Sequence, residues 1–245
     1  MQVTFASEAT PGRANEDHVV AGPGWVVVLD GATARPGVAT GCAHDPGWLV
    51  RRLGGALAAR LALGGGEPLA DLLAGAIEAV RGAHGGACDL GNPDGPSAAV
   101  AMLRHDGGTA DWLVLADSPV LIDTGELRVI KDDRVDRLPS YTDEAVRAAR
   151  NSPGGFWVAA ARPEAAHQAL TGRAAGVRRA AVLTDGASRL VDRFGLADWN
   201  GLLDLLDGAG PRELIRRTRL AEAADDGAGR RGKRYDDATA VMIRF

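Results

Sequence analysis

Short apolar runs and longer one-sided apolar stripes succeed one another along the chain. The short runs are rich in Val, Ile and Leu and are bounded by turn residues, a pattern typical of buried β-strands. They predict strands at Val3–Ala6, Trp25–Leu29, Ala98–Arg104, Trp112–Ala116, Val120–Ile122, Leu127–Ile130, Ala180–Leu183 and Thr239–Phe245. The residues Asp123-Thr-Gly125 separate two of these runs and indicate a hairpin turn.

The one-sided stripes predict amphipathic helices. Leucine recurs at every fourth position from Leu49 to Leu61, and a second stripe with helical spacing runs from Leu69 to Val80. Further helices are expected at Thr142–Arg150, Pro163–Leu170, Asp198–Leu206 and Pro211–Ala223. Strands and helices do not alternate strictly, which disfavours a doubly wound parallel sheet. We therefore expect a mainly antiparallel α+β arrangement in a single domain that spans residues 1–245.

Composition and charge restrict the class of protein. Lys and Arg number 28 against 32 Asp and Glu, and the net charge of −4 argues against a nucleic-acid-binding surface. No apolar run has the length of a membrane span, and the first residues, MQVTFASEAT, lack the regions of a secretory signal. We expect a cytoplasmic protein without nucleic-acid or membrane partners. Cys42 and Cys88 lie far apart without metal-ligand spacing, so we expect two reduced, buried thiols.

Acidic residues follow or precede several predicted strands. Asp30, Asp117 and Asp185 come directly after apolar runs, and Asp236-Asp237 leads into the last strand. An ionised carboxylate beside a buried strand is unfavourable unless it is compensated. Several of them at one rim of a sheet would repel one another unless cations lay between them. Oxygen ligands without Cys or His select Mg²⁺ or Mn²⁺, so the sequence predicts a site for these ions.

Glycine follows two of these aspartates, at Gly31 and Gly186. A residue without a Cβ atom would let the backbone approach a metal ion or its water closely. A further acidic pair, Glu16-Asp17, follows Asn15 near the start of the chain.

Five motifs together resemble those of the metal-dependent serine/threonine phosphatases, the PPM or protein phosphatase 2C-like family. They are NED at 15–17, VVVLDG at 26–31, LADS at 115–118, LTDG at 183–186 and DDAT at 236–239, in the order seen in that family. The resemblance extends over nearly the whole chain. It implies a four-layer α/β/β/α sandwich, in which two mainly antiparallel sheets are flanked by helices, with a two-metal centre at one end.

The resemblance also implies roles for the acidic residues. Asp30 would bridge two Mg²⁺ or Mn²⁺ ions, and the carbonyl of Gly31 would contact one of them. Glu16 would bind one ion, with Asp17 supporting it.

The remaining aspartates complete the implied site. Asp185 and Asp236 would bind the other ion, and Asp117 would hold a third, weaker ion together with Asp185. A water bridging the ions would attack phosphorus in line, without a covalent phosphoenzyme. The implied activity is hydrolysis of phosphoserine or phosphothreonine in proteins, such as the targets of a cognate kinase. We expect the enzyme to be a monomer.

The chain departs from the family pattern at several positions. The family's phosphate-binding Arg lies three residues before the Asn of NED, whereas this chain has Gly12 there and Arg13 one residue later. We expect Arg13, with Asp30, to be catalytic, and Arg35 is a substitute for Arg13. The family's GDSR-like motif has become ADSP at 116–119, which weakens the expectation of a third metal.

Other residues near these motifs have structural alternatives. His44 could approach the site, but we expect it to be structural, and His18 to be a half-buried strand residue. The segment Asn151–Trp157 falls where relatives carry a variable flap, so its aromatic residues either contact a protein substrate or pack.

Two other functions compete with a phosphatase of this family. The altered ADSP motif and the displaced Arg13 are also compatible with a catalytically weak or inactive relative that serves as a regulatory or binding module. VVVLDGAT resembles the nucleophile motif of haloacid-dehalogenase-like phosphatases. However, their second Asp is missing, because Gly31 and Ala32 follow Asp30.

Overall fold

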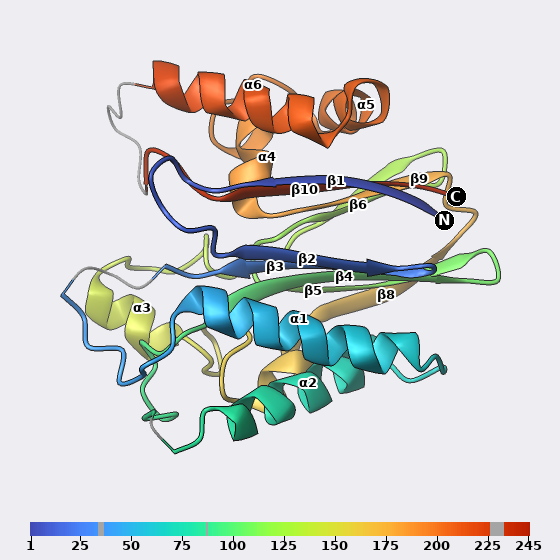
Figure 1. Cartoon of the computed structure of the whole chain (residues 1–245). Coiled ribbons are helices and arrows are strands. Elements are labelled where there is room, and N and C mark those ends of the chain that lie inside the picture. Colours follow the sequence, from blue (N-terminus) through green and yellow to red (C-terminus); the bar gives the residue numbers. More distant parts are fainter. Residues whose placement is uncertain (34–36, 87, 226–232) are drawn as a thin grey trace.

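Two five-stranded sheets pack face to face, and helices cover the outer face of each (Figure 1). The computed structural model describes residues 1–33, 37–86, 88–225 and 233–245. Every strand pair in both sheets is antiparallel. The four-layer α/β/β/α sandwich expected from the sequence is confirmed.

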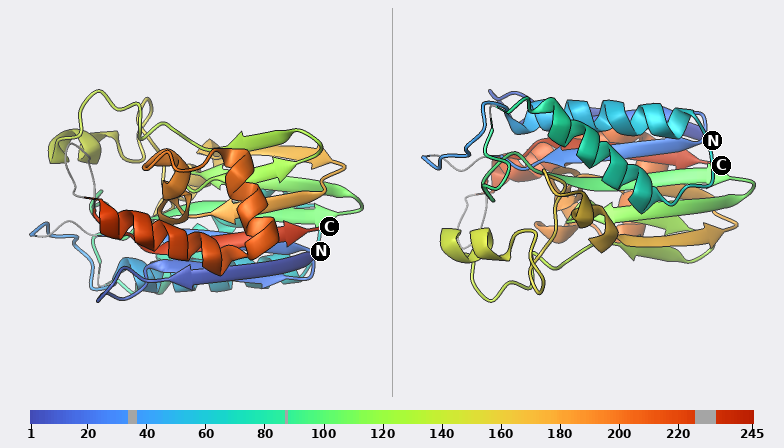
Figure 2. Two further views of the ribbon diagram at one scale, coloured as in Figure 1. Left: turned by 90° about the horizontal axis from the view of Figure 1, so that it is seen from above. Right: turned by 90° about the horizontal axis from the view of Figure 1, so that it is seen from below.

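The first sheet has the strand order β1-β10-β9-β6-β7. Its strands are β1 (Gln2–Glu8), β10 (Ala238–Arg244), β9 (Arg179–Leu183), β6 (Val120–Asp123) and β7 (Leu127–Ile130). The first and last strands of the chain pair along their whole length, from Gln2 opposite Arg244 to Glu8 opposite Ala238. Both termini therefore lie at the same end of the sandwich (Figures 1 and 2).

The second sheet has the order β2-β3-β4-β5-β8. Its strands are β2 (Asp17–Gly22), β3 (Trp25–Gly31), β4 (Ala98–Asp106), β5 (Thr109–Leu115) and β8 (Leu170–Ala175). The continuous apolar run of β3 follows from burial on both faces. Val26 and Val28 pack between the two sheets, whereas Val27 and Leu29 pack against the helices outside.

Two helices cover the second sheet, α1 (Pro46–Ala62) and α2 (Leu69–Ala83). The leucine stripe predicted from the sequence is the buried face of α1, with Leu49, Leu53 and Leu57 at most 1% exposed. The helix α1 begins at Pro46, and the Asp45 carboxylate caps it by accepting a hydrogen bond of 2.6 Å from the Trp48 backbone N–H.

Three helices cover the first sheet, α4 (Asp185–Asp192), α5 (Trp199–Ala209) and α6 (Pro211–Ala224). A short helix, α3 (Asp143–Ala149), lies beside one end of the sandwich, away from both termini (Figure 1). Among the described residues, no helix is both long and apolar enough to cross a bilayer.

The structure differs from the sequence-based prediction at four elements. The strands β2 and β8 were not among the predicted apolar runs, because both lie at sheet edges and only one residue of each is buried. The predicted helix Pro163–Leu170 is a 3-10 helix, η1 (Pro163–Gln168), which leads into β8. The helix α4 begins at Asp185, where the sequence predicted no helix.

Candidate metal centre

The acidic residues singled out in the sequence gather at the end of the sandwich opposite the termini. Asp30 lies near the end of β3, directly opposite Asp17 on β2 in the antiparallel register. Asp185 is the first residue of α4, just after β9, and Asp117 follows β5. Asp236 precedes β10, the neighbour of β9 in the sheet. Adjacent strand ends therefore bring residues distant in sequence to one place.

These carboxylates lie close enough to raise one another's pKa values by charge repulsion. Burial raises the pKa of Asp30 well above its ordinary value, and the charges of Asp17, Asp185, Asp117 and Asp236 raise it further. Like charges that share a low-dielectric site disfavour the ionised form. The five side chains therefore act as one electrostatic group centred on Asp30.

Two further aspartates titrate far from their usual range. Burial, with the neighbouring charge of Asp185, raises the pKa of Asp117 to about 7. Burial and the charge of Asp236 also raise the pKa of Asp185, which shares a hydrogen bond with Asp30. At neutral pH these groups would ionise together only with cations among them.

Asp17 is buried next to Asp30. Its Oδ2 accepts a hydrogen bond of 3.0 Å from the Thr184 hydroxyl. Its Oδ1 is buried and has no hydrogen-bond partner in the part of the chain that the structure describes. Burial and the charges of Asp237 and Asp185 raise the pKa of Asp17 to about 8. An unpaired buried carboxylate oxygen is costly, so this residue fits a site completed by a cation.

Asp237 positions the loop that carries Glu16, a role that the sequence analysis missed. Its two carboxylate oxygens accept hydrogen bonds of 2.6 Å from the backbone N–H groups of Thr10 and Glu16. The Glu16 carboxylate accepts a hydrogen bond from the Thr33 hydroxyl, and burial raises its pKa. The signal was present in the sequence as the second Asp of DDAT, but the sequence does not show that Asp236 and Asp237 face different partners.

The two glycines after Asp30 and Asp185 permit close approach of backbone to backbone. A Cβ atom on Gly31 would lie 2.6 Å from the carbonyl oxygen of Glu16, and one on Gly186 would overlap the carbonyl oxygen of Asp237. The approach that the sequence predicted toward a metal or its water is thus, in this structure, an approach toward neighbouring carbonyls. Glycine is required because it lets the loops that carry the acidic residues meet.

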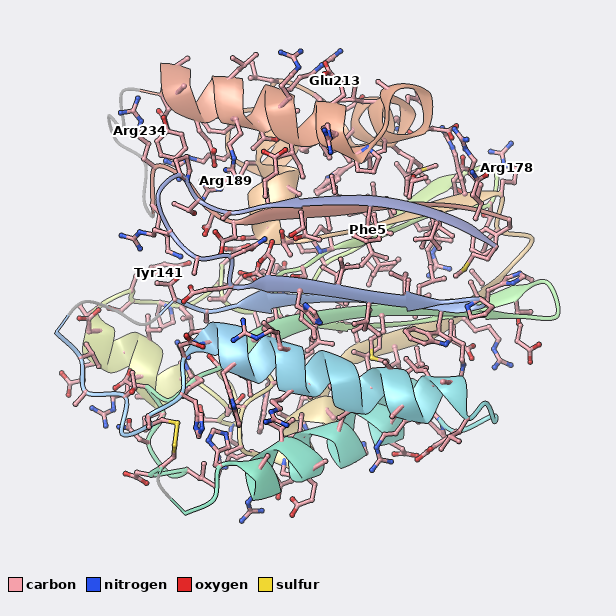
Figure 3. The ribbon with its side chains drawn as sticks, in the orientation of Figure 1. Phe5, Tyr141, Arg178, Arg189, Glu213 and Arg234 are labelled. Carbon is pink, nitrogen blue, oxygen red and sulfur yellow. A yellow bond between two sulfur atoms is a disulfide. The ribbon has the colours of Figure 1, made fainter. Side chains whose placement is uncertain are left out.

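Basic side chains contact the cluster at Asp236. Its Oδ2 accepts a hydrogen bond of 2.7 Å from Arg189, and its Oδ1 lies 3.2 Å from the Lys233 ammonium. Lys233 also donates to the Thr33 hydroxyl over 2.6 Å. Figure 3 places Arg189 between α6 and the sheet beneath it. Two cations therefore balance Asp236, whereas Asp30, Asp117 and Asp185 are mainly surrounded by one another.

A cavity of about 670 Å³ opens onto the carboxylates. Asp30, Asp117, Asp185 and Asp236 all line it. Its other lining residues include one aromatic side chain, Phe156, two further acidic side chains, and five basic side chains, Lys131, Arg150, Arg189, Arg193 and Lys233. The cavity thus combines an acidic floor with positive charge at its sides, which suits an anionic ligand bound through metal ions.

Arg13 does not line this cavity. It lies in a smaller cavity of about 100 Å³ that is shared with Glu16, Thr33 and Lys233. Its side chain is exposed in the turn that precedes β2. Arg35, the substitute for Arg13, lies outside the described residues.

Neither of the two histidines near the motifs lines the cavity of Asp30, Asp117, Asp185 and Asp236, but His44 shares a separate cavity with Glu16. His18 packs on α1, since a Cβ atom on Gly54 would lie 2.6 Å from its ring. His44 stacks on Trp48 at 3.9 Å between ring centroids. The expectation for the cysteines is wrong, because the structure joins Cys42 and Cys88 in a disulfide. The loop before α1 and the loop after α2 bring them together although they are far apart in sequence.

For the aromatic residues of the Asn151–Trp157 segment, the sequence left two alternatives open, contact with a substrate or packing. Phe156 is buried, lines the main cavity and packs with Ala99 and Val158. Trp157 packs instead against the apolar core beneath the second sheet. Phe156 is therefore the aromatic residue placed to meet a ligand.

The comparisons with known proteins find similarity in structure. No protein-family model matches the chain, and no curated protein sequence matches it. Serine/threonine phosphatase Stp1 from Staphylococcus aureus superposes with a TM-score of 0.66 at 10% identity, covering 100% of this chain and 94% of that one.

Two other solved phosphatases align over similar lengths. The catalytic domain of the serine/threonine phosphatase PstP, in complex with two manganese ions, has a TM-score of 0.59 at 19% identity, covering 98% of this chain and 96% of that one. The PPM Ser-Thr phosphatase MsPP from Mycobacterium smegmatis, in complex with cacodylate, has a TM-score of 0.60 at 20% identity, covering 100% of this chain and 98% of that one. The chain thus has the fold of the bacterial PPM-type serine/threonine phosphatases.

Proposed function

We propose that the protein is a metal-dependent phosphomonoester hydrolase that removes phosphate from phosphoserine and phosphothreonine in proteins. One observation carries the proposal: four carboxylates, those of Asp30, Asp117, Asp185 and Asp236, line one cavity of a fold shared with PPM-type phosphatases, and the buried Asp17 adjoins Asp30. Such a group has no evident use in a purely structural role, because its charges repel one another.

The donor set fits hard divalent cations. Asp30, Asp185 and Asp236 offer oxygen ligands in the cavity, which Gly31 and Asp117 also line, and Glu16 offers its carboxylate from the smaller cavity that it shares with Thr33 and Lys233. We propose that these residues hold Mg²⁺ or Mn²⁺, with Asp17 and Asp237 orienting them. Two bound ions would supply an activated water for in-line attack on phosphorus and neutralise charge on the phosphoryl oxygens.

The chain's own residues would bind and orient the phosphate. Lys131 and Arg150 line the cavity, so an anion bound there would meet positive charge, and Lys131 also pairs with Asp192 over 2.8 Å. Arg150 is held by a hydrogen bond of 2.7 Å to the Ser97 hydroxyl and lies 5.7 Å from the Phe156 ring. This pairing would fix the guanidinium at the wall, where it could donate to phosphoryl oxygens.

The proposal is tested with p-nitrophenyl phosphate and with a phosphothreonine peptide. Hydrolysis should require added Mn²⁺ or Mg²⁺ and stop with EDTA. Asp30→Asn should lower kcat by roughly 10³-fold or more, because it removes the carboxylate at the centre of the group. Circular dichroism should show that the variant remains folded.

Asp106→Asn serves as the matched control, because Asp106 is an exposed aspartate at the other end of β4. It should leave turnover unchanged. Turnover that persists after exhaustive chelation, or in Asp30→Asn, would refute the proposed chemistry.

A regulatory or binding module is the second candidate function. The ion pairs of Asp236 with Arg189 and Lys233 favour it, since these cations occupy an oxygen donor that a metal would need. A module of this kind would bind a phosphothreonine peptide without hydrolysing it at any concentration of Mn²⁺. Calorimetric titration of the peptide beside the turnover assay separates the two functions.

A further inference from the structure

A second group of potential metal ligands lies outside the carboxylate cavity. The ligand atoms of Cys42, His44, His84 and Cys88 all lie within 4.8 Å of one another. Two thiols and two imidazoles make a ligand set that structural zinc sites use. The proposed phosphatase chemistry needs none of these residues.

Three separations between a nitrogen and a sulfur match the edges of a zinc tetrahedron, whereas the two sulfurs are bonded to each other and would have to move apart to bind an ion. The Nδ1 atom of His44 lies 3.5 Å from the sulfur of Cys42 and 3.4 Å from that of Cys88. The Nδ1 atom of His84 lies 3.5 Å from the sulfur of Cys42. Zinc bonds of about 2.3 Å to sulfur and about 2.0–2.1 Å to nitrogen, at tetrahedral angles, place sulfur and nitrogen roughly 3.6 Å apart.

The fold holds both imidazole rings in place. Cys42 and His44 lie just before α1, and His84 caps the end of α2, with Cys88 in the loop that follows. Trp48 stacks on His44 at 3.9 Å and lies 4.7 Å from the ring of His84, measured between ring centroids. His84 is only 6% exposed. Such packing fixes which nitrogen of each ring faces the two sulfurs.

We propose that Cys42, His44, His84 and Cys88 bind a structural zinc ion when the cysteines are reduced. In this structure the two sulfurs form a disulfide, visible as a yellow bond in Figure 3. A dithiol reductant would break that bond by supplying two electrons and two protons, becoming a disulfide itself. The two thiols would then release their protons as they bind zinc.

The ion would fix the segment that leads from β3 into α1. His44 and Asp45 line a cavity of about 440 Å³ together with Glu16 and Thr33, so one wall of that cavity lies beside the carboxylate group. Zinc would join this wall to the end of α2. It would therefore stabilise the neighbourhood of the carboxylates without contacting the phosphate.

The test uses the full chain, reduced with a phosphine that leaves no competing thiol. After desalting, elemental analysis should find about one zinc ion per chain. The Asp30→Asn variant should retain it, because the carboxylate group is a separate site. The variant Cys42→Ser/Cys88→Ser should retain no zinc above background.

Cobalt gives a readout that does not depend on any variant folding. Co²⁺ added to the reduced wild-type chain should produce a thiolate-to-cobalt charge-transfer band and the strong visible bands of a tetrahedral site, and zinc should abolish them. His44→Gln keeps both thiols and should weaken cobalt binding by at least about tenfold. A reduced wild-type chain without the thiolate band, or with no more zinc than the double serine variant, would overturn the proposal.

Discussion

Single residues in the carboxylate group differ in what compensates their charge. Arg189 and Lys233 balance Asp236, and backbone N–H groups satisfy both oxygens of Asp237. Asp30 and Asp17 have no such compensation, and their pKa values are raised accordingly. The least compensated carboxylates are therefore those for which bound cations would change the free energy most.

A substitution of Arg13 tests whether this residue contacts the phosphate. If its guanidinium reaches the phosphate from the smaller cavity, Arg13→Ala should raise KM for a phosphothreonine peptide by roughly 10–100-fold with little change in kcat. Steady-state kinetics at saturating Mn²⁺ measure both constants.

Arg216→Ala is the matched control, because Arg216 is an exposed arginine paired with Glu213 on α6. It should change neither constant. Unaltered KM and kcat in Arg13→Ala would assign phosphate binding to the cavity residues Arg150 or Lys131 instead.

Functional residues could be predicted where each lies in a recognisable short motif. They could not be predicted where residues of two distant segments form the site together. Asp30, Asp117, Asp185 and Asp236 stood out because each adjoins an apolar run. The group of two cysteines and two histidines did not stand out, because each of its two segments contributes one Cys and one His. The spacing of Cys42 to His44 and of His84 to Cys88 differs from the short Cys-x2–4-Cys and His-x3–5-His pairs typical of zinc sites.

Among the elements, α6 reaches the carboxylate group through a buried ion-pair network. Glu222 is fully buried and accepts hydrogen bonds of 2.7 Å from both Arg189 and Arg219. Arg189 in turn holds Asp236, and Arg219 donates to the Asp236 carbonyl. The helix therefore fixes the segment that enters β10.

Glu222→Ala should cost about 3–5 kcal/mol of unfolding free energy, because it leaves two guanidinium groups without their buried partner. Urea denaturation followed by circular dichroism measures the loss. Glu213→Ala is the control on the same helix, where Glu213 pairs with Arg216 and Arg217 on the outer surface (Figure 3). Its loss should be much smaller, because solvent screens this exposed pair. Equal losses in the two variants would contradict a structural role for the buried network.

Elements were predictable in proportion to how much of their surface is apolar. The strand β3 and the helices α1 and α2 carry continuous stripes, and the structure has them where the sequence indicated. The strand β2 begins with Asp17 and His18; His18 was expected on a strand, but the short apolar part did not define the strand's bounds. The helix α4 begins with Asp185-Gly186, which favours a turn unless the following residues pack, as Ala187 and Leu190 do.

At the scale of the whole molecule, the carboxylate group couples stability to pH. In the metal-free protein, the pKa values of Asp17 and Asp117 are about 8 and about 7, whereas their ordinary value is 3.8. Between pH of about 4 and 8 the folded state therefore holds more protons than the unfolded state. Its stability should fall as the pH rises through this range.

The clearest measurement compares pH 7.5 with pH 8.5 in EDTA, because histidines are mostly neutral in the unfolded state over that range. Each proton that only the folded state retains contributes up to about 1.4 kcal/mol per pH unit, so melting should begin at a lower temperature at the higher pH. Saturating Mn²⁺ should reverse the trend, since the ions favour ionised carboxylates. In Asp17→Asn the decline should be smaller, and an equal decline in that variant would exclude Asp17 as its source.

The antiparallel pairing of β1 with β10 has a practical consequence for engineering. Both chain ends emerge together at the pole remote from the carboxylates, so an affinity tag or a reporter domain fused at either end would leave the cavity open. A short linker could also join the two ends and new ends could be cut in the turn between β4 and β5. Such a circularly permuted chain would preserve every ligand position, and β5 instead of β1 would be the first strand synthesised.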